Sequence, residues 1–501
     1  MRTSGVLMHL TSLPSPHGIG TMGATARGFV DFLAQAGQTY WQLLPICPTS
    51  FGDSPYQTFS TFAGNPYLID LDDLADHGLL ERSEYEPLNW GDDLSQVDYG
   101  LMYRLRYPVL RLACRRFLEN PPAEYTTFCA ENTFWLEDYA FFMALKERHG
   151  GAPWQEWSAP LRRRESTALS AARAELEGEL DFWKVVQFLF FRQWRALKRY
   201  ANAQGVYIIG DLPIYVSGDS VDVWANPEQF QLDDDLLPTE VAGCPPDGFS
   251  AEGQLWGNPL FDWKHMEATG YAWWVRRMGY QCGIYDVLRI DHFRGFDSYY
   301  AIPYGAADAR NGVWREGPGM KVFRAVEGAI GKRPIIAEDL GFLTPSVRQL
   351  LKDSGFPGMR VLEFAFDSRD GNGSDYLPHN FTRHCVAYTG THDNETVLGW
   401  MASAPAADVA YAREYLRVNE TERPNWTMMR AIWASVADTA VVQMQDLLDL
   451  GGEGRMNEPS TVGKNWKWRA LPGFDSGALA ARLRRETEIY CRIPLPEEDT
   501  P

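Results

Sequence analysis

The chain has 501 residues and a mass of 56.8 kDa, and its 66 acidic against 47 basic side chains give a formal charge of −19. Such a charge repels the phosphate backbone of nucleic acids and the anionic surface of membranes, so neither is an expected partner. The seven cysteines are widely spread and contain no CxxC pair, which is typical of a protein kept in a reducing cytoplasm. The absence of a cleavable signal pattern and of a long apolar run also predicts a cytoplasmic protein.

Short apolar runs recur along the chain and predict β-strands that end near polar or acidic residues. The eight runs are 5–10, 40–44, 206–209, 285–290, 334–337, 359–364, 385–388 and 439–444. Most gaps between them carry the apolar spacing of helices, as in Phe29, Phe32 and Leu33 before Gly37, a predicted C-cap. The alternation predicts an α/β fold, a (β/α)8 TIM barrel with large, mainly helical insertions. Residues 1–501 are expected to form one catalytic unit with no separate C-terminal β-domain.

Two gaps between predicted strands are too long for a simple crossover. The first, 48–205 after the second strand, contains a dense apolar and aromatic stretch and predicts an inserted, mainly helical subdomain. The second, 217–276 after the third strand, is rich in Pro, Gly, Asp and Trp and predicts a loop-rich insert near the active site.

Acidic residues stand at four of the eight predicted strand ends: Asp211, Asp291, Glu338 and Asp393. In a barrel the C-terminal ends of parallel strands meet at one rim, so we expect these side chains to share one pocket. Crowded like charges cost stability that a purely structural role would avoid. The pattern therefore indicates a functional site.

The pair Arg289 and Asp291 suggests how the acids divide their work. Residues two apart on a strand point the same way, so the guanidinium is expected to lower the pKa of Asp291 and keep it ionised as a nucleophile. Glu338 follows an apolar run close to other carboxylates, and a raised pKa would suit a general acid that later acts as a base. Such a pair is what retaining glycosyl transfer requires. Asp339 must face the other way and is expected to be structural.

Asp393 is expected to bind sugar hydroxyls and to favour a distorted ring. His292 and His392 are expected to serve as neutral hydrogen-bond partners for hydroxyl groups.

The order and spacing of these motifs resemble the amylomaltases, the 4-α-glucanotransferases of glycoside hydrolase family 77 in the α-amylase clan. The resemblance rests on segments along the whole chain, namely 10–14, 18–20, 53–57, 63–67, 210–216, 245–247, 253–259, 455–457 and 465–466, together with the acidic strand ends. It implies transfer of α-1,4-glucan segments between malto-oligosaccharides, amylose or glucose. No dedicated calcium site is evident in the sequence, so neither a metal nor a cofactor is expected. It also implies that Asp291 is the nucleophile, Glu338 the acid/base and Asp393 the stabiliser of the transition state.

The resemblance further implies substrate contacts from residues outside the catalytic carboxylates. Those matched to the donor glucosyl unit are Tyr56, Asp211, Arg289, His292 and His392. Trp256 and Asn465 match further glucan contacts. The family's loop over the acceptor side often carries two adjacent aromatics, whereas here Gly248 takes the first place and Phe249 the second. Glycine would make this loop more mobile.

Three alternatives compete with this interpretation. An α-amylase-type hydrolase would use the same carboxylates and differ only in whether water or a sugar hydroxyl intercepts the intermediate. A metal-dependent hydrolase could use Asp291 with His292 and His392 with Asp393, although neighbouring strand residues point to opposite faces and Arg289 would repel a cation. A non-catalytic glucan-binding protein would not need three acids beside an arginine.

Overall fold

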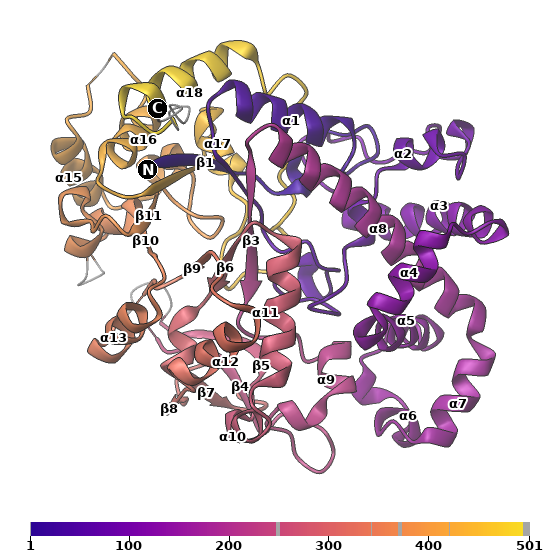
Figure 1. The fold of residues 1–501 in the computed structure, drawn as a ribbon. Helices are drawn as coiled ribbons and strands as arrows, with labels where there is room; N and C mark the ends of the chain where they lie inside the picture. Colours follow the sequence, from indigo (N-terminus) through magenta and orange to yellow (C-terminus); the bar gives the residue numbers. More distant parts are fainter. Residues whose placement is uncertain (1, 247–250, 342, 369–372, 420, 494–501) are drawn as a thin grey trace, which may run out of the picture.

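A computed structural model describes residues 2–246, 251–341, 343–368, 373–419 and 421–493. At its centre eight parallel strands form a closed barrel in which chain order is kept around the ring (Figure 1). The strands are β1 (Thr3–Leu7), β2 (Tyr40–Gln42), β3 (Tyr207–Pro213), β6 (Val287–Asp291), β9 (Ile335–Ala337), β10 (Gly358–Val361), β11 (Cys385–Tyr388) and β12 (Thr439–Gln443), with β12 pairing back to β1. All eight predicted strands are present, and the predicted TIM barrel is confirmed.

Helices surround the barrel, and an amphipathic helix such as α1 (Ala24–Gln35) buries its apolar face. In α1, Phe29, Phe32 and Leu33 are buried, and Gly37 takes the left-handed φ of 68° just beyond the helix, as predicted. The covering helices are α1 (Ala24–Gln35), α11 (Ala272–Ile284), α12 (Met320–Ile330), α13 (Pro345–Ser354), α14 (Val397–Ser403), α15 (Ala406–Leu416), α16 (Pro424–Ala434), α17 (Met444–Leu447) and α18 (Gly477–Ile489). Between β12 and residue 493 the described chain holds helices and turns but no strand.

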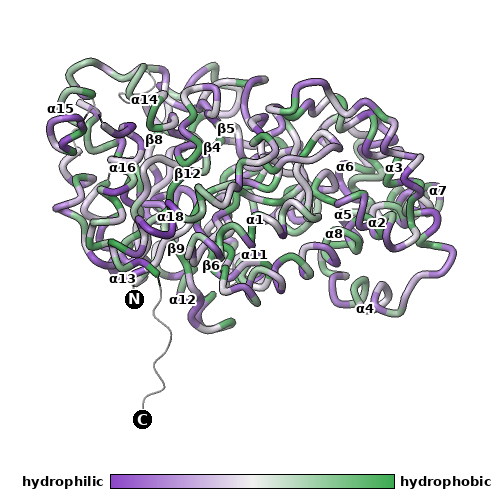
Figure 2. Tube along the Cα trace, turned by 90° about the horizontal axis from the view of Figure 1, so that it is seen from above, coloured by the Kyte–Doolittle hydropathy of each residue, from purple (hydrophilic) through white to green (hydrophobic). Residues whose placement is uncertain are grey.

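The gap between β2 and β3 is mainly helical and lies to one side of the barrel (Figure 1). Its helices are α2 (Leu71–Asp76), α3 (Tyr99–Glu119), α4 (Ala123–Glu131), α5 (Thr133–Arg148), α6 (Ala159–Arg162), α7 (Ser166–Glu175) and α8 (Glu177–Ala203). The long helix α8 packs both on α3 and α5 and on α1 and β3, which explains why its apolar residues occupy more than one face. Figure 2 shows hydrophobic stretches at α5 and α8 and hydrophilic ones at the outer helices α7 and α15.

The gap between β3 and β6 is more regular than a loop-rich insert. It contains α9 (Val221–Ala225), β4 (Glu240–Cys244), β5 (Gln254–Pro259) and α10 (Trp263–Ala268). Strands β4 and β5 join β7 (Ser298–Pro303) and β8 (Val313–Glu316), which follow β6, in an antiparallel sheet of order β5-β4-β7-β8. Regular strands therefore lie within a segment in which the sequence indicated mainly loops. Strand β4 pairs with the nearby β5 and with β7, and the residues of β7 that pair with β4 lie more than fifty residues further along the chain, where no local sequence pattern points to them.

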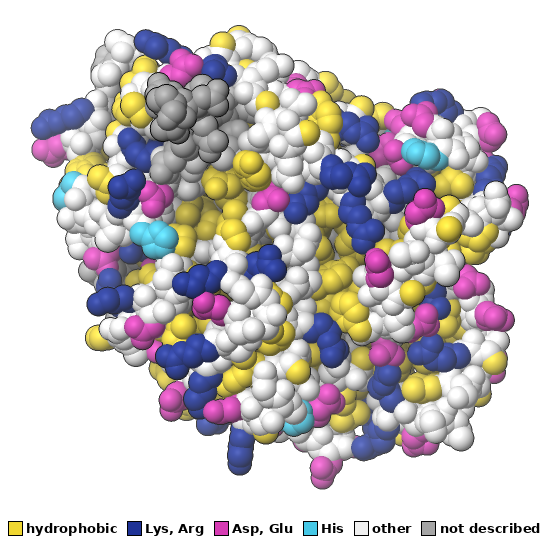
Figure 3. Space-filling model, viewed as in Figure 1, with side chains coloured by type: hydrophobic (Ala, Val, Ile, Leu, Met, Phe, Trp, Pro, Cys, Tyr) yellow, Lys and Arg dark blue, Asp and Glu magenta, His cyan; other side chains and the backbone are white. Residues whose placement is uncertain are grey.

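The face of the molecule in Figure 3 carries Lys and Arg interspersed with Asp and Glu, without a basic patch. No helix in the described ranges is both long and apolar enough to cross a membrane.

Candidate active site

The C-terminal rim of the barrel surrounds a cavity of about 1380 Å³. Asp291 is the last residue of β6, Glu338 follows β9 directly, and Asp393 lies in the loop after β11, so three parallel strands bring these acids together. The predicted site residues that border the cavity are Tyr56, Trp256, Arg289, Asp291, His292, Glu338, His392, Asp393 and Asn465. Phe249 and Gly248 lie outside the residues that the structure describes.

Arg289 bridges two carboxylates at the floor of the cavity. Its Nη1 lies 2.7 and 2.6 Å from the two carboxylate oxygens of Asp211 and 3.1 Å from Oδ1 of Asp291. The pairing of β3 with β6 sets this geometry, since Asp211 and Arg289 are directly opposite each other. Arg289 and Asp291 therefore point the same way, as the strand alternation predicted.

Asp211 lies one layer behind the cavity wall. Its side chain is fully buried, whereas that of Asp291 is 26% exposed. Besides its ion pair with Arg289, it accepts a hydrogen bond of 2.7 Å from the hydroxyl of Tyr56. Asp211 was expected to contact the donor sugar, but its buried position suits holding Arg289 and Tyr56 in place.

The pKa of Asp291 differs from the sequence-based expectation. Burial raises it, and the neighbouring carboxylates of Asp211 and Asp393 add to the rise, while Arg289 lowers it by only part of that amount. The prediction of a lowered pKa was wrong because the strand pattern shows the arginine but not the depth of the site. Arg289 still makes the ionised form of Asp291 far less costly than burial alone would allow.

Glu338 is held by the turn that follows Asp291. Its carboxylate accepts a hydrogen bond from the main-chain N–H of His292, a residue in the left-handed region with φ 52°. A non-glycine residue in this region is uncommon and costs backbone energy, which is typical of functional sites. Burial and the charge of Asp291 raise the pKa of Glu338, as predicted for a general acid.

The next residue, Asp339, faces away: it accepts the N–H of Met359 at 2.6 Å and pairs with Arg360 at 3.1 Å, which is the predicted structural role.

Asp393 is held by Asn457, a residue to which the sequence alone assigned no role. The side-chain amide of Asn457 donates to Asp393 Oδ1 at 2.6 Å, and the N–H of Asn457 donates to the carbonyl oxygen of His392 at 3.1 Å. Arg455 donates to the carbonyl oxygen of Asp393 at 3.2 Å. Both residues belong to the 455–457 motif, so the sequence marked them as part of the family pattern but did not show that they contact Asp393.

Aromatic rings form the wall around these acids. Tyr56 stacks on His392 with ring centroids 5.0 Å apart, and Trp256 meets His292 edge-on at 4.8 Å. Burial lowers the pKa of His292 to about 3 and also lowers that of His392, so both rings are neutral at pH 7. The amide of Asn465 is engaged within its own loop, where it accepts the N–H of Glu458 at 3.0 Å.

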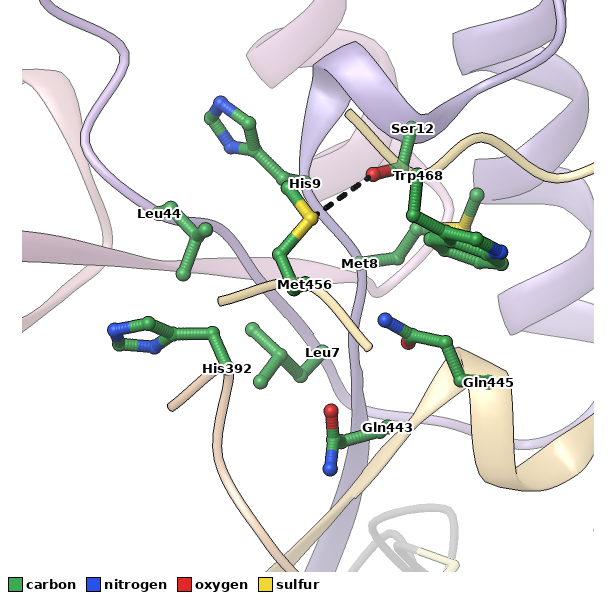
Figure 4. A pocket seen from close by; sticks show the side chains of 10 residues that line it. All are labelled: Leu7, Met8, His9, Ser12, Leu44, His392, Gln443, Gln445, Met456 and Trp468. Atoms are coloured by element: carbon green, nitrogen blue, oxygen red, sulfur yellow. Dashed lines mark hydrogen bonds between the residues drawn. The ribbon is translucent and has the colours of Figure 1, made fainter. Parts of the chain in front are cut away.

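A small cavity of about 10 Å³ lies behind His392 (Figure 4). Leu7, His9, Met456 and Gln443 are among the side chains around it. His9 is buried, and burial lowers its pKa to about 3, so it is neutral at pH 7 and adds no charge beside the loop of His392 and Asp393. The His392 ring is thus backed by neutral groups on this side.

Within the described ranges, no three His, Cys, Asp or Glu side chains are arranged as ligands of a metal ion.

Comparison with known proteins places this geometry in a family. A sequence model of glycoside hydrolase family 77, described as 4-alpha-glucanotransferase, matches residues 8–473. The 4-alpha-glucanotransferase of Clostridium butyricum is 47% identical over 487 residues, which is 97% of this chain and all of that protein. The 4-alpha-glucanotransferase of Thermus thermophilus is 48% identical over 98% of this chain and 99% of its own length. The structure of amylomaltase from Streptococcus agalactiae in complex with acarbose is 44% identical, covers 98% of this chain and 100% of its own, and superposes with a TM-score of 0.96.

Proposed function

The chain belongs to the 4-alpha-glucanotransferase family, the amylomaltases, and has that activity, and we propose that Asp291, Glu338 and Asp393 carry the reaction. The observation that carries this proposal is the position of Asp291 and Glu338 on one cavity, with Arg289 3.1 Å from Asp291 and the His292 N–H bound to Glu338. One carboxylate is thereby favoured as the anion and the other as the acid.

In the first half of the reaction Asp291 attacks the anomeric carbon of the donor glucan. The bond from that carbon to the glycosidic oxygen breaks, and Glu338 gives its proton to the departing oxygen. In the second half the 4-hydroxyl of an acceptor attacks the same carbon, Glu338 takes up the hydroxyl proton, and Asp291 leaves as a carboxylate. The cycle balances with the two sugars and the two carboxyl groups, and it needs neither a metal nor a cofactor.

Asp393 stands where it can bind hydroxyls of the reacting ring. Asn457 and His392, whose Nε2 is 3.3 Å from Asp393 Oδ1, fix its carboxylate, and 48% of its side chain remains exposed to the cavity. Hydrogen bonds that strengthen as the ring flattens lower the barrier to transfer. Tyr56, Arg289, His292, His392 and Trp256 border the same space and are proposed to hold the donor glucosyl unit.

The substrates are proposed to be α-1,4-glucans, with malto-oligosaccharides or amylose as donors and glucose or a glucan as acceptor. The acarbose complex of the similar amylomaltase supports a glucan-shaped cleft. We also place the protein in the cytoplasm, because all seven cysteines are free thiols and Cys47, Cys114 and Cys385 are buried where no disulfide partner reaches them.

Incubation with maltotriose as the sole sugar tests the proposed reaction. We expect glucose together with oligosaccharides longer than maltotriose, since a sugar hydroxyl intercepts the intermediate. Chromatography of the products over time is the measurement. Products that are only shorter than the substrate would instead identify a hydrolase, and an unchanged sugar would identify a binding protein.

The rate of transfer should depend on pH in a bell-shaped way. Burial raises the pKa of Asp291 to about 7 and that of Glu338 to about 8. Below the lower value Asp291 gains a proton and cannot attack, and above the higher value Glu338 loses the proton it must donate. We therefore expect kcat/KM for maltotriose to fall on both sides of this window. A rate that stays constant from pH 5 to pH 9 would contradict the assignment of Asp291 as the ionised nucleophile and Glu338 as the protonated acid.

A further inference from the structure

The cavity extends beyond the catalytic carboxylates along the antiparallel sheet β5-β4-β7-β8. We call this part of the cavity the sheet arm. It is bordered by Glu252, between β4 and β5, and by Ala307, Asp308 and Trp314, which follow β7. They belong to the same continuous space as Asp291 and Glu338. A substrate longer than the reacting units would therefore have a surface on which to lie.

Trp314 is the residue of this arm whose placement most needs an explanation. It lies on the edge strand β8, whose four residues are all exposed, and 42% of its own surface is accessible. The sheet register places it opposite Tyr300, and the two rings lie 5.2 Å apart. Single exposed aromatic side chains are common, but Trp314 also borders the cavity that holds the catalytic carboxylates, so its accessible ring is available to a bound ligand.

The Trp314 ring is held in a fixed position from behind. The guanidinium of Arg294 lies 4.0 Å from the centre of the ring, and Arg294 itself is only 6% exposed. A guanidinium stacked on an indole face orients the ring and leaves the remaining surface to the cavity. Arg294 belongs to the short helix η7 (Phe293–Phe296), which directly follows the turn after Asp291. The residue that supports the Trp314 ring, Arg294, therefore belongs to the segment that follows the nucleophile, whereas Trp314 itself lies on β8.

Polar groups accompany the ring, as recognition of a sugar requires. Asp308 borders the cavity, and Arg310 Nε, which donates to Asp308 Oδ2 at 2.9 Å, fixes its carboxylate. Glu252 borders it as well, and its carbonyl oxygen accepts the N–H of Ala309 at 3.0 Å. A flat apolar ring and carboxylate acceptors on one cavity match a pyranose ring, which presents C–H groups on its faces and hydroxyls around its rim.

We propose that Trp314 is a stacking platform for a glucosyl unit remote from the bond that reacts, and that it makes the enzyme favour long glucans. Trp256 packs directly on His292 and so serves positions near the nucleophile, whereas Arg294 separates Trp314 from that turn. Short oligosaccharides bind without reaching Trp314, and long ones gain its contact. This inference rests on the proposed function of the catalytic cavity.

The test compares Trp314→Ala with the unchanged enzyme on maltotriose and on maltoheptaose. We expect kcat/KM for maltoheptaose to fall by about 5-fold to 10-fold, the size of one stacking contact, mainly through KM. The kcat/KM for maltotriose should stay within about twofold of that of the unchanged enzyme, since a short chain does not reach Trp314 and loses no contact with it. Trp314→Phe keeps a flat ring and should recover most of the loss.

Tyr304→Ala is the matched control, because Tyr304 follows β7, is 53% exposed and does not border the cavity in the described part of the chain. It should leave both substrates unaffected. Trp314→Leu provides a second variant: it keeps an apolar cover over Arg294 without a flat face, so the same contrast can be read from it if the alanine variant fails to fold.

Equal losses for both substrates, or no loss for either, would overturn the platform. Failure of the unchanged enzyme to disproportionate maltotriose would instead contradict the proposed function itself.

Discussion

Replacing Asp291 with asparagine is expected to lower kcat for maltotriose disproportionation by at least about 10⁴-fold, because an amide cannot form the glycosyl ester on which both half-reactions depend. Asparagine has the same shape, so binding of the sugar should change little. Release of glucose and formation of longer oligosaccharides, measured by chromatography, give the rate. Retention of more than a few per cent of the activity would show that another group is the nucleophile.

The same variant should remain folded and be at least as stable as the parent protein at neutral pH. The pKa of Asp291 is raised in the folded state, so ionising this group opposes folding at every pH above its unfolded value. Asparagine removes that cost, and Arg289 keeps both oxygens of Asp211 as partners. Thermal unfolding followed by circular dichroism distinguishes a chemical loss from a structural one.

Asp339→Asn supplies the matched control one residue beyond the acid/base. Asp339 is also a buried carboxylate, but it faces Arg360 and the N–H of Met359. Removing the charge of Asp339 leaves the buried guanidinium of Arg360 without its ion-pair partner, so we expect a lower melting temperature with kcat changed by less than about tenfold.

The barrel was predictable because each strand has its own local signal. Parallel strands that are buried on both sides read as short apolar runs, and the acids at the ends of four of these runs mark the rim that carries the site. The antiparallel sheet was not predictable in this way, since Trp314 and Tyr300 acquire their meaning from pairing across a turn and from Arg294, which lies on a different element. The spacing of residue types along the sequence does not reveal which distant segments pair in the folded protein.

In the catalytic site, too, local features were predictable from the sequence, whereas features that depend on distant segments were not. Alternation along one strand was enough to put Arg289 and Asp291 on one side, and the distance of 3.1 Å confirms it. The depth of the pocket could not be deduced from that strand, and depth is what raises the pKa of Asp291. Similarly, Asn457 was visible as part of a motif, but its hydrogen bond to Asp393 joins segments 64 residues apart.

Replacing Glu338 with glutamine should separate the two halves of the reaction. Glutamine cannot protonate the departing oxygen, and general acid catalysis contributes about 10²-fold to 10⁴-fold, so disproportionation of maltotriose should fall by an amount in this range. A donor whose leaving group needs no proton, such as α-glucosyl fluoride, bypasses that requirement. The variant should therefore release fluoride in a rapid burst equal to the amount of enzyme, and then slow because no base activates the acceptor hydroxyl.

The contrast with Asp291→Asn decides the assignment of roles. Loss of the nucleophile should abolish the burst, since no covalent intermediate forms from either donor. Loss of the acid should preserve it and should also remove the alkaline fall of the pH profile, because that limb belongs to deprotonation of Glu338. Fluoride release measured in the first turnover, with both variants side by side, is the experiment. Equal losses on maltotriose and on α-glucosyl fluoride in the Glu338→Gln variant would mean that Glu338 positions the sugar and that the proton comes from elsewhere.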